Sequence, residues 1–176
     1  MTRARERALR LKLMAFDVDG VLTDGTIWFT AEGDVMKGFS TLDGHGLRML
    51  QQAGIELAII TGRRSKALEQ RCENLQITRL YQGVEDKRAV LRGLLAELKL
   101  DASQAGYMGD DVVDLPILRA CGFAATTADG HPLVRQHVDM VSSRPGGRGA
   151  VREVTDFILE AQGQLAAFNA RYLADE

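Results

Sequence analysis

The chain has 176 residues, with 22 Lys and Arg against 24 Asp and Glu, a formal net charge of −2 at pH 7. Apolar residues make up 45% and charged residues 26% of the chain, which excludes a disordered or low-complexity protein. The near-neutral charge provides no electrostatic footprint for nucleic acid or an anionic membrane, and every apolar run is far too short to span a bilayer.

The amino-terminal residues are basic, with five positive side chains ahead of the first apolar run: Arg3, Arg5, Arg7, Arg10 and Lys12. The run itself, Leu13 to Phe16, is too short for the core of a signal peptide. We therefore expect a partly frayed leader before a first strand. Two cysteines do not make a disulfide framework, which favours a cytoplasmic location.

Short apolar runs then alternate with amphipathic segments. The runs predict buried strands at residues 11–18, 55–60, 78–81, 105–108, 123–126 and 139–142. Helical spacing predicts helices at residues 43–52, after Ser65, from Asp86, after Asp111, from His131 and over 149–172. The alternation predicts a single α/β domain over residues 1–176, a Rossmann-like parallel sheet with helices on both faces.

Residues 26–40 break this alternation and predict a protruding β-hairpin. Two β-prone runs flank the polar residues 31–34. Ile27, Trp28 and Phe29 are apolar in succession, so both faces of the first strand favour burial. Because an isolated two-stranded ribbon is marginal in water, we expect the hairpin to pack on another surface.

Two carboxylates follow the first predicted strand in the segment DVDGVLTD. Asp17 and Asp19 lie two residues apart, so they share a face where the strand ends, and they repel unless a cation or a division of roles relieves them. An EF-hand loop does not fit, because its third ligand would be Val21 and its twelfth residue would be Trp28. For an isolated pair, a capped turn is an equally good interpretation.

Three later features change that balance: the TGR segment 61–63, Lys87 and the GDDVVD segment 109–114. Taken singly, each has a simpler interpretation, respectively a helix-entry turn, a solvated lysine and an N-cap at Asp111 or Asp114. Together, however, they follow the carboxyl ends of predicted strands, which line one crevice in an open α/β sheet. Carboxylates, a hydroxyl and an ammonium there suit Mg²⁺ and a phosphoryl group.

The segments DVDGVLTD, TGR, the isolated Lys87 and GDDVVD resemble, in order, the four motifs of the haloacid dehalogenase superfamily of aspartyl phosphatases. Four further segments, FSTLDGHGL, AIITGRRSKALEQRCENL, LYQG and GGRGAVREV, resemble its capless 3-deoxy-D-manno-octulosonate 8-phosphate phosphatase branch, over about residues 11–163. The resemblance implies Mg²⁺-dependent hydrolysis of that sugar acid phosphate through an aspartyl-phosphate, in lipopolysaccharide precursor synthesis. It also implies a homotetramer whose hairpins associate and whose sites are each closed by an adjacent chain.

The resemblance also implies roles for individual residues. Asp17 would be the nucleophile, and Asp19 the general acid and then the general base. Mg²⁺ would be held by Asp17, the backbone carbonyl of Asp19 and Asp110, while Thr61 and Lys87 would bind the transferring phosphoryl group. The substrate would lie among Asp19, Ser40, Thr41, Leu42, Asp43, Gly44, Arg63, Arg71 and Lys87.

The intervals between the motifs leave no room for a lid domain. Residues 19–61 hold only the hairpin and one helix, and residues 61–87 hold one helix and one strand. A small-molecule site still needs water excluded, so a neighbouring subunit is the natural source of its cover. The interval lengths thus agree with the implied homotetramer.

Two arginines, Arg63 and Arg148, each have two interpretations. Arg63 suits a substrate carboxylate and favours the octulosonate over a nonulosonate 9-phosphate, since nonulosonate enzymes tend to carry an acidic residue there; a surface arginine is its simpler interpretation. Arg148 either closes over a substrate or marks a flexible turn.

Two other functions are alternatives to the octulosonate phosphatase. They are a phosphatase for a nonulosonate 9-phosphate or another small phosphorylated acid, and a non-enzymatic phospho-receiver module. Asp19 speaks against the receiver, which lacks a second aspartate at that position.

Overall fold

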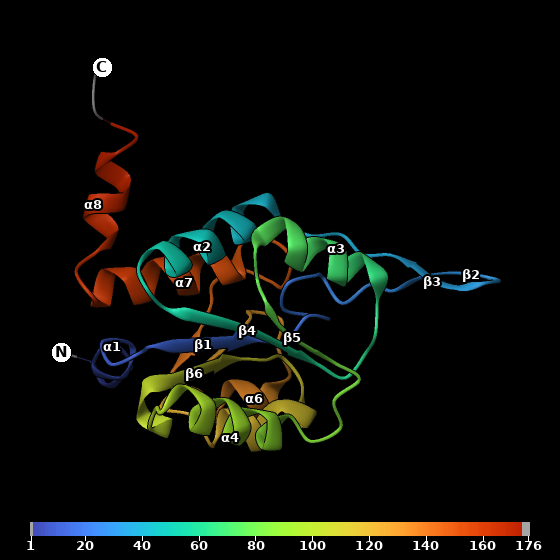
Figure 1. Ribbon diagram of the computed structural model, residues 1–176, viewed down its shortest axis with the longest axis horizontal. Helices are drawn as coiled ribbons and strands as arrows, with labels where there is room; N and C mark the ends of the chain where they lie inside the picture. Colours follow the sequence, from blue (N-terminus) through green and yellow to red (C-terminus); the bar gives the residue numbers. More distant parts are fainter. Residues whose placement is uncertain (1, 174–176) are drawn as a thin grey trace.

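A central parallel sheet organises the chain. The structure, a computed structural model, describes residues 2–173, and at residues 34 and 35 only the backbone. Six strands lie in the order β5-β4-β1-β6-β7-β8, and each neighbouring pair is parallel (Figure 1). They are β1 (Leu13–Phe16), β4 (Glu56–Thr61), β5 (Arg79–Gln82), β6 (Ala105–Met108), β7 (Phe123–Thr126) and β8 (Met140–Val141). The predicted parallel sheet is confirmed, with β1 shorter than the apolar run that predicts it.

Helices cover both faces of the sheet, as predicted. Figure 1 shows α2 (Thr41–Gln52), α3 (Lys66–Leu75) and α7 (Ala150–Ala161) on one side, and α4 (Lys87–Leu98) and α6 (Pro132–Arg135) on the other. Alternate residues of β1 serve the two sides. Met14 and Phe16 pack with the α2 and α7 layer, while Leu13 and Ala15 pack with α4 and with α5 (Leu115–Leu118). Short 3₁₀ turns at Ala102–Gln104 and Val112–Asp114 complete the second side.

The first helix of the upper layer, α2, begins two residues earlier than its apolar spacing predicts. Ser40 is its N-cap, and the Ser40 hydroxyl accepts a hydrogen bond from the backbone N–H of Asp43 at 3.3 Å. At its carboxyl end Gly54 has a φ of +81°, a conformation that suits a glycine just beyond a helix. In the middle, a Cβ on Gly46 would lie 2.3 Å from Thr155 Oγ1 of α7, so glycine permits the close approach of these two helices.

The basic leader is a helix and not a frayed segment. Residues Arg3–Ala8 form α1, whose Ala8 is fully buried in the core that α7 completes. Arg7 holds the leader to the body, because its guanidinium donates to both oxygens of Asp139 at 2.7 and 2.8 Å. This long-range ion pair could not be inferred from the local sequence.

The carboxyl-terminal tail is two helices, which corrects the single helix predicted over 149–172. The first is α7, and the second, α8, spans Leu165–Ala170 and turns away from the body (Figure 1). Gly163 interrupts them with a φ of +72°, a conformation that suits glycine. The side chain of Gln162 fixes the turn by donating to the carbonyls of Ala8 and Leu11.

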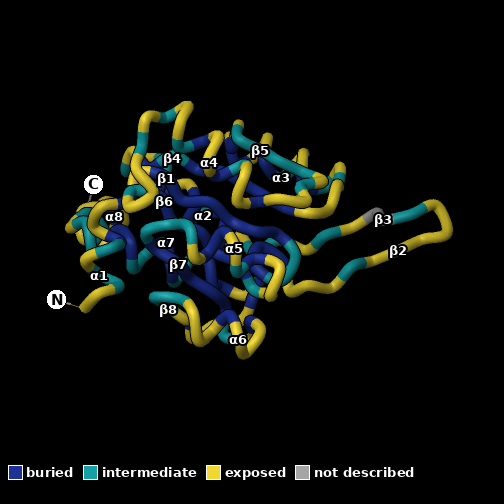
Figure 2. Tube along the Cα trace, turned by 90° about the horizontal axis from the view of Figure 1, so that it is seen from below, coloured by how far each residue is buried: buried dark blue, intermediate teal, exposed yellow. Residues whose placement is uncertain are grey.

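The hairpin protrudes from the body as an exposed ribbon (Figure 2). Its strands, β2 (Trp28–Thr30) and β3 (Gly33–Met36), are antiparallel and form a sheet of their own. Trp28, Phe29 and Met36 are 57%, 62% and 59% exposed, although they are large and apolar. The hairpin predicted for residues 26–40 is thus confirmed, and within a single chain these three apolar side chains remain exposed. Among the described residues, no helix is both long and apolar enough to cross a membrane.

Candidate active site

The polar residues of the predicted motifs meet in one cleft at the carboxyl end of the sheet. Asp17 directly follows β1, Thr61 ends β4, Lys87 begins α4 after β5, and Asp110 follows β6. The cleft has a volume of about 350 Å³ and is lined by Asp17, Asp19, Thr61, Gly62, Arg63, Val84, Glu85, Lys87, Asp110, Asp111 and Val113. The predicted convergence is therefore a feature of the fold.

Lys87 is buried at the base of this cleft and is not a solvated surface lysine. Its Nζ atom lies 2.8 Å from Oδ2 of Asp17 and 2.7 Å from Oδ1 of Asp114, and it donates to the Tyr107 hydroxyl at 3.2 Å. Burial alone would lower the pKa of Lys87, but the charges of Asp17 and Asp114 outweigh it and raise that pKa. Lys87 is thus held as a cation beside Asp17.

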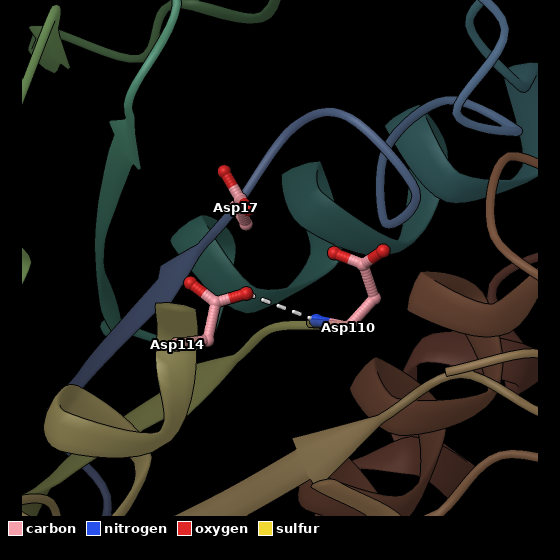
Figure 3. A group of neighbouring side chains, drawn as sticks. All are labelled: Asp17, Asp110 and Asp114. Carbon is pink, nitrogen blue, oxygen red and sulfur yellow. Dashed lines mark hydrogen bonds between the residues drawn. The ribbon is translucent and has the colours of Figure 1, made fainter. Parts of the chain in front are cut away.

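Asp114 is a hydrogen-bond acceptor for other residues of the site. Besides Lys87, its Oδ1 accepts from the Tyr107 hydroxyl at 3.1 Å, and its Oδ2 accepts from the backbone N–H of Asp110 at 3.1 Å (Figure 3). Both of its oxygens are therefore occupied by partners from the chain itself. Asp111, in contrast, is the N-cap of the turn Val112–Asp114, so the capping interpretation holds for Asp111.

Asp17, Asp110 and Asp114 form an acidic cluster, with one carboxylate oxygen from each lying within 4.8 Å of the others. Burial, and then repulsion from Asp114, raises the pKa of Asp17 to about 6, against the lowering effect of Lys87. Burial, and then repulsion from Asp17 and Asp114, raises the pKa of Asp110 to about 7. Within the described chain, Oδ1 of Asp17 is buried and accepts no hydrogen bond. A bound cation would relieve both the repulsion and the unpartnered oxygen.

The loop after β1 is shaped by close contacts with two other segments. Gly20 has a φ of +86°, and a Cβ there would lie 2.1 Å from Oδ2 of Asp110. From the far end of the chain, Gly146 packs so closely that its Cβ would lie 1.9 Å from the Gly20 carbonyl oxygen, and the Gly147 N–H donates to Val21 at 2.9 Å. Arg148 reaches Asp24 at 3.3 Å. The segment 146–148 is therefore docked on the loop that follows Asp17.

Two cations flank the carboxylate of Asp19. The Nζ atom of Lys37 contacts Oδ1, and Nε of Arg63 lies 3.9 Å from Oδ2. Lys37 directly follows β3, while the Arg63 guanidinium lies 5.6 Å from the ring centroid of Phe29 in β2. Both cations therefore connect Asp19 with the hairpin.

The remaining predicted substrate residues lie outside the lining of the cleft. Ser40, Asp43, Gly44 and Arg71 share a separate small hollow, and Arg71 donates to the Ser40 carbonyl at 3.0 Å. Leu42 lies on a different hollow beside α7, and Thr41 is exposed in the first turn of α2.

Asp43 is committed to the start of α7. It is 1% exposed, and its carboxylate accepts backbone N–H bonds from Gly149 and Arg152 at 3.3 and 2.8 Å. In the single chain, its carboxylate therefore serves the packing of α2 against α7.

The sequence motifs do not predict the contacts of three residues of the site. These are Lys37, Tyr107 and Asp114, the last as the partner of Lys87. Tyr107 carries a signal, because a tyrosine within the otherwise buried segment AGYM needs a hydrogen-bond partner. Asp114 also carries one, as a third carboxylate four residues after Asp110. Lys37 has no such signal, since nothing in the hairpin's sequence indicates that its side chain turns towards Asp19.

Comparison with known proteins identifies relatives over almost the whole chain, although no family model matches it. It is 46% identical to the 3-deoxy-D-manno-octulosonate 8-phosphate phosphatase of Yersinia pestis over 160 residues, which cover 91% of this chain and 86% of the relative. It is 44% identical to the Escherichia coli (strain K12) protein of the same name over 159 residues, covering 90% and 85%.

A solved structure extends the likeness. The Moraxella catarrhalis phosphatase of this name, in complex with a magnesium ion, a phosphate ion and a KDO molecule, is 42% identical with a TM-score of 0.94, covering 98% of this chain and 99% of that one. Identity of this extent, together with the shared fold, shows the family. The chain belongs to the 3-deoxy-D-manno-octulosonate 8-phosphate phosphatase family, within the haloacid dehalogenase superfamily.

Proposed function

We propose that this protein is a Mg²⁺-dependent phosphatase that hydrolyses 3-deoxy-D-manno-octulosonate 8-phosphate to the free sugar acid and phosphate, in lipopolysaccharide precursor synthesis. The observation that carries the proposal is the state of Asp17. One of its oxygens is paired with Lys87, and the other is buried in an acidic cluster without a partner among the described residues. The names of the curated relatives support the choice of substrate.

Asp17, Asp110 and the backbone carbonyl of Asp19 would hold the Mg²⁺. The donor set fits, because carboxylate and carbonyl oxygens are the ligands this ion prefers. Asp114 is not included, since both of its oxygens already accept hydrogen bonds within the chain. When bound, Mg²⁺ supplies positive charge that lets an anionic phosphate approach the carboxylates and neutralises charge during transfer.

The side chains then divide the reaction into two displacements. A carboxylate oxygen of Asp17 attacks phosphorus, the bond to the sugar oxygen breaks, and protonated Asp19 gives its proton to that oxygen. Asp19 then takes a proton from water, which attacks the aspartyl-phosphate and releases phosphate. Lys87 and Thr61, which line the same cleft, bind the phosphoryl oxygens throughout.

The sugar acid itself would be held at the mouth of the cleft. Arg63 lines that cleft with its side chain 42% exposed, and its planar guanidinium suits bidentate contact with a carboxylate. Arg71 and the segment Ser40–Gly44 would complete the pocket from the neighbouring hollow. Lys87 and Asp19 would contact the substrate at its phosphorylated end.

The working unit would be a homotetramer of single-domain chains in the cytoplasm, with the apolar hairpin as the interface. Trp28, Phe29 and Met36 expose apolar surface next to a cleft that no described cap segment covers. Association through these residues would bury that surface and bring an adjacent chain over the site.

The experiment that tests the function is phosphate release from a panel of esters, with Mg²⁺ and with EDTA. The octulosonate 8-phosphate should be hydrolysed with a higher kcat/KM than a nonulosonate 9-phosphate, glucose 6-phosphate or 4-nitrophenyl phosphate, and only with Mg²⁺. Equal kcat/KM values across the panel, or turnover in EDTA, would contradict the proposal. Faster turnover of the nonulosonate would move the assignment to that acid.

A further inference from the structure

Lys37 contacts Asp19 through a buried side chain that does not line the cleft. The side chain of Lys37 is only 1% exposed, and its Nζ atom contacts Oδ1 of Asp19. Asp19 lines the cleft, whereas Lys37 is not among the described residues that do. A lysine with this degree of burial is unusual, and here its ammonium group is turned onto one carboxylate. Lys37 therefore reaches Asp19 without facing the space that a substrate would occupy.

Asp19 needs such support because of where it lies. It sits in the loop after β1, outside regular structure, with its side chain 20% exposed. Its second oxygen is 3.9 Å from Nε of Arg63, a longer and more exposed contact. The buried ammonium of Lys37 is therefore the firmer of the two cationic contacts that orient this carboxylate.

We propose that Lys37 is a positioning residue for the reaction, which holds the Asp19 carboxylate in the orientation required of the general acid. The inference rests on the proposed role of Asp19. An acid must lie within hydrogen-bond reach of the leaving oxygen, and a displacement of about 1 Å can reduce the rate about a hundredfold. Lys37 belongs to the hairpin segment, so this support depends on the placement of the hairpin.

The test compares two leaving groups in Lys37→Met and Lys37→Arg. A sugar alkoxide needs a proton from the acid, whereas 4-nitrophenolate leaves without one. The value of kcat/KM reports the steps up to loss of the leaving group. For Lys37→Met we expect a fall of about ten- to a hundredfold with the octulosonate phosphate and less than about threefold with 4-nitrophenyl phosphate. Lys37→Arg should restore most of the loss.

A second arm asks whether Lys37 acts through Asp19. In an Asp19→Asn background, Lys37→Met should cause little further loss, because the group it positions has gone. Lys12→Met, at an exposed lysine on the opposite end of β1, is the matched control and should leave both rates unchanged. If circular dichroism shows that Lys37→Met does not fold, Lys37→Gln is assayed instead.

An equal loss with both esters, no loss, or full additivity with Asp19→Asn would overturn the inference. These results are distinguishable from failure of the proposed function. If the octulosonate phosphate is not a substrate, glucose 6-phosphate replaces it as the ester with a poor leaving group, and the comparison of leaving groups still applies. If Asp19→Asn loses the same factor of kcat/KM with both esters, Asp19 is not the general acid. The inference about Lys37 then fails with the role of Asp19.

Discussion

Lys87 and Asp17 form a buried ion pair of 2.8 Å, although they lie 70 residues apart in the chain and on different elements. The pair occupies Oδ2 of Asp17 and leaves Oδ1 without a hydrogen-bond partner among residues 2–173 as far as their side chains are described. Lys87 therefore fixes the orientation of the carboxylate, with Oδ2 paired to the ammonium group and Oδ1 in the acidic cluster. Tyr107 and Asp114 in turn hold Lys87, so Asp17 is positioned by a series of buried contacts.

Replacing Lys87 tests whether these buried contacts position Asp17. Lys87→Met should reduce kcat by about a hundred- to a thousandfold and lower the free energy of unfolding by about 3 kcal/mol, because it leaves Asp17 and Asp114 as buried charges without their cation. Steady-state kinetics and urea unfolding measure the two effects. Arg88→Met, one residue along and exposed, should change neither. An active and fully stable Lys87→Met protein would show that the pair is not required.

Asp17→Asn removes the proposed nucleophile with almost no change of volume. We expect phosphatase activity to fall to the background of the assay, since an amide does not form the aspartyl-phosphate. Unfolding stability without Mg²⁺ should fall less than in Lys87→Met, because the repulsion between Asp17 and Asp114 is also removed. Appreciable turnover by Asp17→Asn, with the substitution verified by mass spectrometry, would contradict the mechanism.

The metal-free protein should lose stability as the pH rises from 5 to 8. The pKa of Asp17 is raised from 3.8 to about 6, and that of Asp110 from 3.8 to about 7. A raised carboxyl pKa contributes stability at low pH that is lost as the pH rises through the folded-state value, since the unfolded chain has already released its proton.

Thermal unfolding at pH 5 and pH 8, in EDTA and in Mg²⁺, measures this effect. Mg²⁺ should raise the Tm more at pH 8 than at pH 5, because it binds the deprotonated carboxylates. Asp110→Asn should weaken both the pH dependence and the response to Mg²⁺. A metal-free protein with a higher Tm at pH 8 would indicate that other groups dominate.

Two glycines make a matched pair for the nucleophile loop. Gly20→Ala should abolish activity, because Gly20 has a positive φ and the added methyl group would lie 2.1 Å from Oδ2 of Asp110. Gly93→Ala adds the same methyl group within α4, where no described atom beyond the chain neighbours and the helix's own backbone lies within 4 Å. That variant should keep full activity and gain up to about 1 kcal/mol of unfolding free energy. Equal activity in the two variants would show that the loop has room to adjust.

The hairpin can be tested by adding charge where its two strands leave the body, at the paired residues Trp28 and Met36. Trp28→Lys combined with Met36→Lys should reduce the molar mass measured by light scattering, because charge replaces the exposed apolar surface. Activity should fall with it if an adjacent chain covers the site. Leu133→Lys, which adds charge at a 41% exposed leucine in α6, is the control. An unchanged mass in the double variant would exclude the hairpin as the interface.

Much of the site can be predicted from the sequence because its geometry follows from topology. Asp17, Thr61 and Asp110 each end a short apolar run, and the carboxyl ends of parallel strands meet at one edge of a sheet. Local periodicity is enough to place those runs. The leader helix is harder to predict from the sequence, because the ion pair that holds it joins Arg7 to Asp139, 132 residues away.

The side-chain contacts within the site are harder to predict for the same reason. Whether Lys37 points to solvent or to Asp19 depends on how the hairpin leaves the body, and no pattern within residues 26–40 encodes that direction. Asp43 illustrates the opposite case. It is a motif residue expected near the substrate, but its carboxylate serves the amino-terminal end of α7. Only tertiary packing distinguishes such roles.

The docking of Gly146 and Gly147 on the loop around Gly20 also bears on how the protein is made. By the time the ribosome has added residue 114, the nascent chain carries every carboxylate of the cleft, together with Thr61 and Lys87. The loop that bears Asp19 still lacks the backbone against which it rests. The nascent chain thus carries the polar groups of the cleft before the backbone that supports their arrangement, so completion of the site waits for the translation of residues 146 and 147.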